Sequence, residues 1–247
     1  MSWQDIYASP WQGVWGLVVV SALFLAWVAI APRAAARGAE PAAAAFVRAW
    51  AVVFAIESIC DATLPALAGV SMLPFVLLGD FRVFLLLEAV ADPGRPLARH
   101  LLAAAAWTLF VPAVTAAVSL GWIAARGPLP GPVADVLAGA TSSQALWLVY
   151  ETAFVALATV LRQVVVPRRR PRASRYLRAV LAYVLAYYGL WALADVAILA
   201  GFDQGWLLRM LPNQLYYGLF VPFAYGLFFA SAPPESAATS SRVQAAR

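Results

Sequence analysis

The chain has no lysine, one cysteine and one histidine, and these scarcities exclude several kinds of chemistry. A retinal Schiff base needs a lysine amine, so photoreception by that route is excluded. Cys60 on its own forms neither an internal disulfide nor a cysteine-based zinc site. His100 on its own supports neither a bis-histidine haem nor a zinc hydrolase built on several histidines. We therefore expect no retinal, haem or zinc cofactor and no metal site.

Charge is scarce as well: 12% of the 247 residues are charged and 64% are hydrophobic, with a mean hydropathy of +0.79. Soluble domains do not have this composition. Apolar runs recur along nearly the whole chain, each long enough to cross about 30 Å of hydrocarbon. Lipid offers no partner to unpaired backbone groups, so the sequence predicts an all-α integral membrane domain over residues 1–230. Residues 231–247, rich in Ser, Ala and Pro, are expected to form a disordered cytoplasmic tail.

Seven apolar stretches are interpreted as transmembrane helices in contact with the lipid bilayer. Their expected ranges are 13–30, 43–67, 72–90, 101–124, 145–166, 176–199 and 207–229. The loops after helices 1, 3 and 5, their flanking residues and the tail lie on one side of the membrane in this topology and hold thirteen arginines. The other side holds two, Arg126 and Arg209. Because basic loops stay in the cytoplasm, we expect the N-terminus outside and the C-terminus inside.

The net charge of +5 follows from this topology, so we expect no nucleic-acid partner. The high arginine and alanine content favours a prokaryotic cytoplasmic (inner) membrane. Whether the chain forms a homo-oligomer is left open by the sequence.

Helices 1–3 and 5–7 share short patterns that favour an internal duplication. Residues 46–49 (FVRA) resemble 176–179 (YLRA), and Asp61 and Asp195 are followed at similar distances by Leu-Ala-Gly. A 3+1+3 parallel repeat is similar to the layout of small sugar carriers of the SWEET and PQ-loop kind, whose Pro-Gln signature is absent here. Coincidence in an Ala- and Leu-rich chain is the alternative. The seven-helix layout with an external N-terminus also resembles microbial rhodopsins, but the missing lysine excludes their chemistry.

Five carboxylates lie inside these apolar stretches: Glu57, Asp61, Asp80, Glu151 and Asp195. A charge at bilayer depth costs about 2.5–3.5 kcal/mol on insertion scales, and such residues usually have a function. A rise of about 1.5 Å per residue places all five roughly 6–15 Å below the outer helix ends. Low dielectric and mutual repulsion favour the protonated form of some of them, which suits a proton-coupled or cation-binding site.

Helix periodicity brings further candidate binding residues to the same depth. Tyr188 and Trp191 share a face with the acid of helix 6, and Asn213 shares a face with Tyr217 on helix 7. Arg82 is the expected partner of the acids. We therefore expect a pocket on the outer side, lined by carboxylates and aromatic rings. At the inner end, we expect Glu88 to form a boundary ion pair with nearby arginines and His100 to be an interfacial residue.

The first functional hypothesis is a carrier or channel for a cation, or for a small polar solute coupled to protons. In this hypothesis the ion is bound by acids of helices 2, 3 and 6, namely Glu57, Asp61, Asp80 and Asp195. The solute is contacted by Trp191, Asn213 and Tyr217.

The second hypothesis is an intramembrane enzyme acting on a lipid or isoprenoid, with the same four acids as candidates for a general acid. Leu78-Gly79-Asp80 and Ala194-Asp195 resemble the paired aspartates of lysoplasmalogenase-like hydrolases, and the size is similar to that of integral-membrane terpene cyclases. A third hypothesis is an accessory membrane subunit whose polar groups only hold helices together.

Overall fold

A computed structural model describes residues 2–9, 16–30, 40–68, 73–125, 143–168 and 171–230. Within these ranges the chain consists of helices joined by short turns, so the all-α prediction is confirmed. The expected tail at 231–247 and Arg126 of the outer loop lie outside the described residues.

The helices follow the predicted stretches closely. In chain order they are α1 (Trp3–Tyr7), α2 (Gly16–Ile30), α3 (Pro41–Ala68), α4 (Leu73–Ala91), α5 (Leu97–Ala125), α7 (Ser143–Val160) with its extensions η2 (Leu161–Val165) and η3 (Val166–Arg168), α8 (Pro171–Leu199), α9 (Gln204–Asn213), the π-helical segment η4 (Gln214–Leu219) and α10 (Phe220–Ala230). The last predicted helix is therefore one continuous rod whose middle is π-helical. The short helix α1 was not predicted.

Four helices are long and apolar enough to cross a membrane: Pro41–Leu64, Leu97–Val118, Gln144–Arg168 and Ala173–Leu199. The described part of α2, Leu17–Ile30, is apolar but shorter. Helix α4 is as apolar on average as these helices, but it carries three charged residues, Asp80, Arg82 and Glu88, within its 19 residues. The count of seven spans and the duplication stay predictions.

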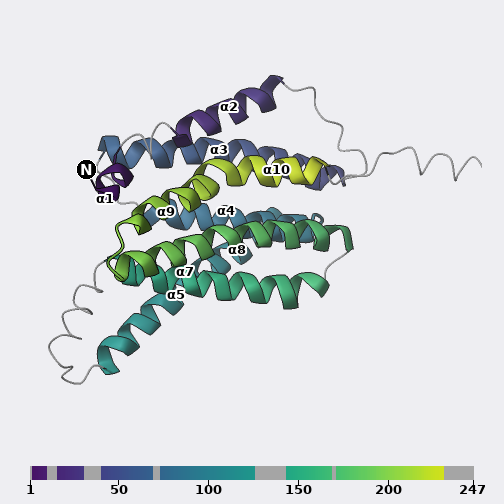
Figure 1. The fold of residues 1–247 in the computed structure, drawn as a ribbon. Helices are drawn as coiled ribbons and strands as arrows, with labels where there is room; N and C mark the ends of the chain where they lie inside the picture. The colour runs from purple at the N-terminus through teal and green to yellow at the C-terminus, as the bar shows by residue number, and fades with distance from the viewer. Residues whose placement is uncertain are drawn as a thin grey trace, which may run out of the picture.

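The long helices form an elongated bundle (Figure 1). Helices α3, α4, α8 and α10 run along its length, while α2 crosses one edge and α5 diverges at the other. The core is rich in aromatic rings, including Phe54, Phe84, Phe154 and Phe220, which are each at most 4% exposed. The bundle therefore buries rings where many membrane proteins bury small residues.

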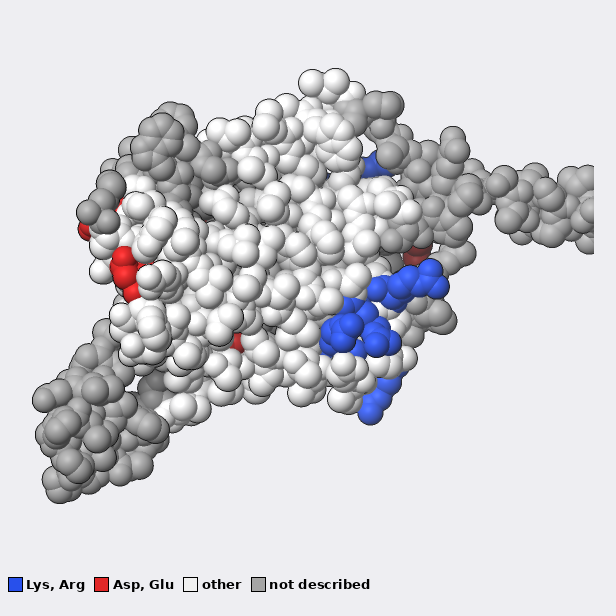
Figure 2. Space-filling view, viewed as in Figure 1, with Lys and Arg blue, Asp and Glu red and all other residues white. Residues whose placement is uncertain are grey.

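Large apolar side chains also cover the outside of the bundle. Leu23 and Trp27 on α2, Leu102 on α5 and Leu193 on α8 are all more than half exposed. In Figure 2 most of this face is uncharged; the arginines gather at one end, and the most exposed acids lie at the other. An apolar exterior with charges at the ends and inside is the arrangement that a lipid environment favours.

Two short features hold α1 against the turn between α8 and α9. Gly201, with a φ of +87°, closes α8 in a Schellman motif in which the Phe202 N–H donates to the Ala197 carbonyl at 2.9 Å. The next residue, Asp203, accepts a hydrogen bond from the Trp3 N–H at 2.8 Å. Helix α1 begins with a capping box between Ser2 and Asp5, whose hydrogen bonds lower the pKa of Asp5. These contacts hold α1 beside the start of α9.

Candidate functional site

Arg82 is the centre of the first polar cluster. Its side chain is fully buried on α4 and reaches across to α3, where Nη1 donates to Glu57 Oε2 at 3.1 Å and to Ser58 Oγ at 3.0 Å. Its Nη2 donates to the backbone carbonyl of Tyr216 in η4. One guanidinium thus joins three elements through three acceptors, which the planar five-donor group of arginine suits.

The π-helical geometry of η4 explains how a backbone carbonyl becomes available to Arg82. A π segment inserts an extra residue into an α-helix, so the regular carbonyl partners are shifted at its junctions. The guanidinium also stacks over the rings of Tyr216 and Phe220, at 4.6 and 5.5 Å from their centroids. These faces stabilise a buried cation.

Asp80, two residues before Arg82 on α4, is the centre of a second cluster. It is fully buried and accepts hydrogen bonds from the hydroxyls of Tyr150, Tyr188 and Tyr216, which come from α7, α8 and η4. Gly79 is required here, because a Cβ at this position would overlap the phenol of Tyr216. The small residue allows the ring to approach α4 closely enough to reach the carboxylate.

Arg209 is the centre of the third cluster. It is 8% exposed, forms an ion pair with Asp195 of α8 and lies 3.6 Å from Glu151 of α7. Its Nε donates to the hydroxyl of Tyr7 at 3.3 Å. Sequence reasoning counted Arg209 among the outer-loop arginines, and the structure places it inside the bundle. It adds a second buried cation to Arg82.

Asn213 extends this cluster by one helical turn. Its side-chain amide donates to the Tyr7 hydroxyl at 3.3 Å, and its carbonyl oxygen accepts from Trp191 Nε1 at 2.7 Å. The short helix α1 therefore closes the cluster through a single tyrosine.

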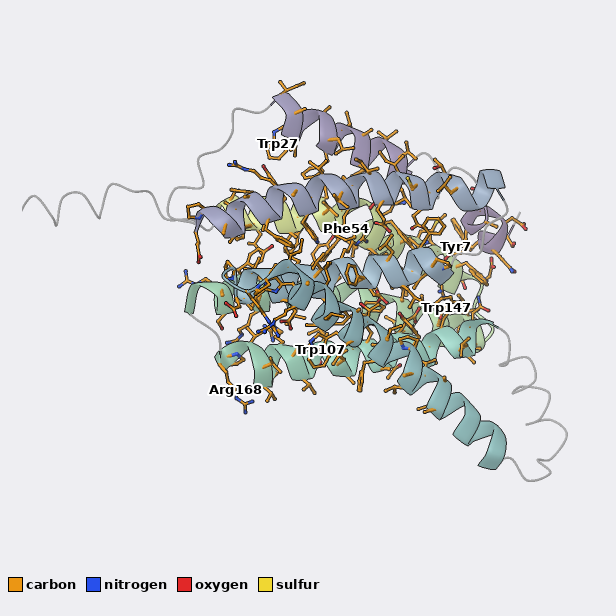
Figure 3. The ribbon with its side chains drawn as sticks, turned by 180° about the vertical axis from the view of Figure 1, so that it is seen from behind. Tyr7, Trp27, Phe54, Trp107, Trp147 and Arg168 are labelled. Atoms are coloured by element: carbon orange, nitrogen blue, oxygen red, sulfur yellow. The ribbon has the colours of Figure 1, made fainter. Side chains whose placement is uncertain are left out.

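A cavity of about 200 Å³ lies between these clusters. Residues from α1, α4, α7, α8, α9 and η4 line it: Tyr7, Val76, Trp147, Tyr150, Glu151, Tyr188, Trp191, Arg209, Asn213, Tyr216 and Tyr217. Most of the wall is aromatic, and the charges that reach it come from Glu151 and Arg209. Figure 3 shows Tyr7 and Trp147 at one end of the bundle and Arg168 at the opposite end.

Three of the five buried acids have dedicated donors, and two do not. Glu57 pairs with Arg82, Asp195 with Arg209, and Asp80 is held by three tyrosines. Within the described part of the chain, Asp61 Oδ1 and Glu151 Oε2 are buried without a hydrogen-bond partner, as is the second oxygen of Asp195. Glu151 shares its arginine with Asp195 at the longer distance. Asp61 and Glu151 are therefore the acids with least compensation.

The structure brings together part of the predicted site. Five of the predicted residues line the cavity: Glu151, Tyr188, Trp191, Asn213 and Tyr217. Asp80 lies behind its tyrosines and Asp195 behind Arg209, while Glu57, Asp61 and Arg82 form the neighbouring cluster on α3 and α4. The sequence predicted one shared group of acids, whereas the structure divides them among three neighbouring clusters.

Sequence reasoning missed Tyr7, Trp147, Tyr150, Arg209 and Tyr216. Two signals were available: Arg209 is one helical turn before Asn213, and Tyr150 directly precedes Glu151. Tyr7 carried no signal, because its role depends on a contact with α9 about 200 residues further along the chain.

At the other end of the bundle, the predicted boundary ion pair of Glu88 is confirmed by a 3.6 Å contact with Arg95. His100, expected to be an interfacial residue, lies in the first turn of α5, and its side chain is 3% exposed. Among the described residues no group of three or more His, Cys, Asp or Glu side chains could hold a metal ion.

The fold and these clusters define a helical protein with four candidate transmembrane helices, buried carboxylates and an aromatic cavity. The chain matches no protein-family model, no curated protein and no solved structure.

Proposed function

We propose that this protein is a membrane carrier that binds a small organic cation in the aromatic cavity and couples its movement to protons. The observation that carries the proposal is the cavity of about 200 Å³ in which ring faces surround Glu151, an acid with an unpartnered buried oxygen. The carrier would use seven spans, with the N-terminus outside, and the internal 3+1+3 duplication would relate its two halves.

The charge balance at the cavity favours a cation over an anion. Glu151 and Asp195 share one guanidinium, so the group has one negative charge in excess when both acids are ionised. An uncompensated charge in a medium of low dielectric is expensive, and a bound cation would offset it. The faces of Trp147, Trp191 and Tyr217 carry the negative potential that attracts ammonium groups.

The Arg82 cluster supplies a site for proton coupling. Asp61 lies one turn after Glu57 on α3, so the two acids share a face and compete for Arg82. Its Oδ1 has no partner among the described residues, and it lies outside the cavity lining. Tyr216 contacts both the cavity and Arg82, so it links proton binding at Asp61 to the cation site.

The orientation expected from the arginines places the cavity on the outer side. Tyr7 and Trp147 lie at the end of the bundle opposite Arg168 (Figure 3). With the arginine-rich end in the cytoplasm, the cavity would receive its ligand from outside.

The test uses purified protein in proteoliposomes that contain a pH-sensitive dye. We expect 2-phenylethylammonium to bind by calorimetry and to drive a proton flux that empty liposomes do not show. Glu151→Gln should weaken binding at least tenfold, which is about 1.4 kcal/mol. Asp61→Asn should keep binding and lose proton flux. Glu40→Gln, an exposed acid outside the clusters, is the matched control and should behave as wild type.

Wild-type flux at the level of empty liposomes would overturn the carrier proposal. Equal binding by wild type and Glu151→Gln would overturn the assignment of the cation site.

Asp80 favours a second candidate, an intramembrane enzyme acting on a lipid or isoprenoid. Its carboxyl is fully buried behind three cavity tyrosines, so in this candidate a proton from Asp80 would reach an apolar substrate through a tyrosine hydroxyl. In that case lipid extracts from cells producing the wild type should contain a product that cells producing Asp80→Asn lack. Identical lipid profiles would exclude this candidate.

A further inference from the structure

A second cavity, of about 170 Å³, lies at the opposite end of the bundle from the aromatic cavity. Helices α3, α4 and α5 and the turn between α4 and α5 form it. Its walls are mostly apolar, with Ala42, Phe46 and Ala89 among the lining residues, and Arg95 and His100 are the ionisable side chains in the lining. Neither the carrier proposal nor its proton site uses this cavity.

His100 is the first sign that the second cavity is built to hold a ligand. The imidazole is 3% exposed, yet its Nδ1 has no hydrogen-bond partner among the described residues. A buried polar atom without a partner costs about 1–3 kcal/mol. The same imidazole lines the cavity, so a ligand that hydrogen-bonds the ring from the cavity side would fix which nitrogen carries the hydrogen.

Arg95 supplies the charge. Its side chain is 37% exposed and lies 3.6 Å from Glu88, a distance beyond an ordinary hydrogen bond. Glu88 also accepts from Trp107 Nε1 at 3.3 Å and lies outside the lining of this cavity. Arg95 therefore keeps guanidinium donors for a second acceptor.

We propose that Arg95 and His100 form a binding site for a phosphate group, from an anionic phospholipid headgroup or from free phosphate. Two nitrogen donors then meet the phosphate oxygens, and the apolar wall of Ala42 and Phe46 accommodates the first carbons of a lipid. No acid lines the cavity, where Arg95 and His100 supply the polar side chains, so the lining itself favours an anion although three acids lie near it. Arg99 is on the same turn as the site, while the nearby acids are Glu40, Glu88 and Asp92.

The position in the bundle also suits a lipid phosphate. The described arginines at the ends of α7 and α8 belong to the same end of the bundle, which Figure 2 shows as the basic end. Basic pockets between helices at the cytoplasmic surface bind anionic headgroups.

Two binding assays separate the sources of phosphate. Native mass spectrometry measures how much phosphatidylglycerol, against phosphatidylcholine, the purified protein retains. Calorimetry with inorganic phosphate measures the free anion. We expect the double variant Arg95→Gln/His100→Gln to bind at least tenfold more weakly than wild type. Arg99→Gln, at the exposed position next to His100 and outside the cavity lining, should weaken binding by no more than about twofold.

Ala42→Leu keeps both donors and fills the cavity from its exposed rim, so it should weaken binding without affecting folding. Retention of phosphatidylglycerol without phosphate binding assigns the lipid, and phosphate binding alone assigns the free anion. Equal binding by wild type, the double variant and Ala42→Leu would overturn the site, as would the absence of binding in both assays.

Discussion

Tyr216 is the residue through which the polar clusters communicate. Its carbonyl accepts from Arg82, and its hydroxyl donates to Asp80 at 3.1 Å or to the Val76 carbonyl at 3.0 Å. Its ring also forms part of the cavity wall. A change in the position of this residue would therefore alter the cavity wall and the hydrogen bonds of Asp80 and Arg82.

Gly79 gives a direct test of this close packing. In Gly79→Ala the added methyl group would push the Tyr216 phenol away from Asp80. Overpacking of a dense core costs about 1–3 kcal/mol, so we expect the midpoint of thermal unfolding to fall by several degrees. Tryptophan fluorescence in nanodiscs measures it. Gly189→Ala on α8 is the control, because a Cβ there meets open space and alanine favours a helix. Equal midpoints for the two variants would contradict the packing.

At the level of single residues, the sequence predicted the acids well and their partners poorly. Carboxylates in apolar runs are conspicuous because their cost in lipid is high. The buried role of Arg209 was not predicted, because a cation near the start of a helix resembles an interfacial residue. Only the fold places Asp195 and Glu151 beside it. Partners depend on helix packing, which periodicity alone does not specify.

Among the elements, the rod formed by α9, η4 and α10 contributes most to the site. Sequence periodicity predicted its length, but a π-helical segment has no reliable composition and so was not expected. The segment places Tyr216 and Tyr217 on the cavity and presents a backbone carbonyl to α4. Segments of this kind often occur at functional sites, because they expose backbone groups that a regular helix keeps paired.

The link between η4, α3 and α4 depends on the shape of the arginine side chain. Arg82→Lys keeps the charge but cannot reach Glu57, Ser58 and the Tyr216 carbonyl with one planar group. We expect a loss of about 2 kcal/mol in the free energy of unfolding, from the hydrogen bonds left unmade. Arg175→Lys, at an exposed position of α8, should change it by no more than about 0.5 kcal/mol. An Arg82→Lys variant as stable as wild type would show that charge alone holds the three elements.

Charged side chains in the whole molecule lie mainly inside the bundle or at its ends. Ion pairs and acids lie inside the bundle, and the remaining described arginines gather at one end, with an apolar exterior between the ends (Figure 2). Composition was enough to predict this separation, because lipid tolerates charge only inside or at the ends. The relative placement of α2 and α5 at the edges of the bundle was not predictable, since both are apolar on all sides and their sequences do not specify a neighbour.

The expected orientation is testable because the chain has a single cysteine. In a Cys60→Ala background, Gln4→Cys and Arg168→Cys introduce exposed thiols at opposite ends of the bundle. Five predicted spans separate these positions. We expect a membrane-impermeant maleimide to label Gln4→Cys on intact cells and Arg168→Cys only after permeabilisation. The reverse pattern would invert the orientation, and labelling of both on intact cells would mean an even number of spans between them. The reverse pattern would also place the aromatic cavity on the inner side and the Arg95–His100 site on the outer side of the membrane.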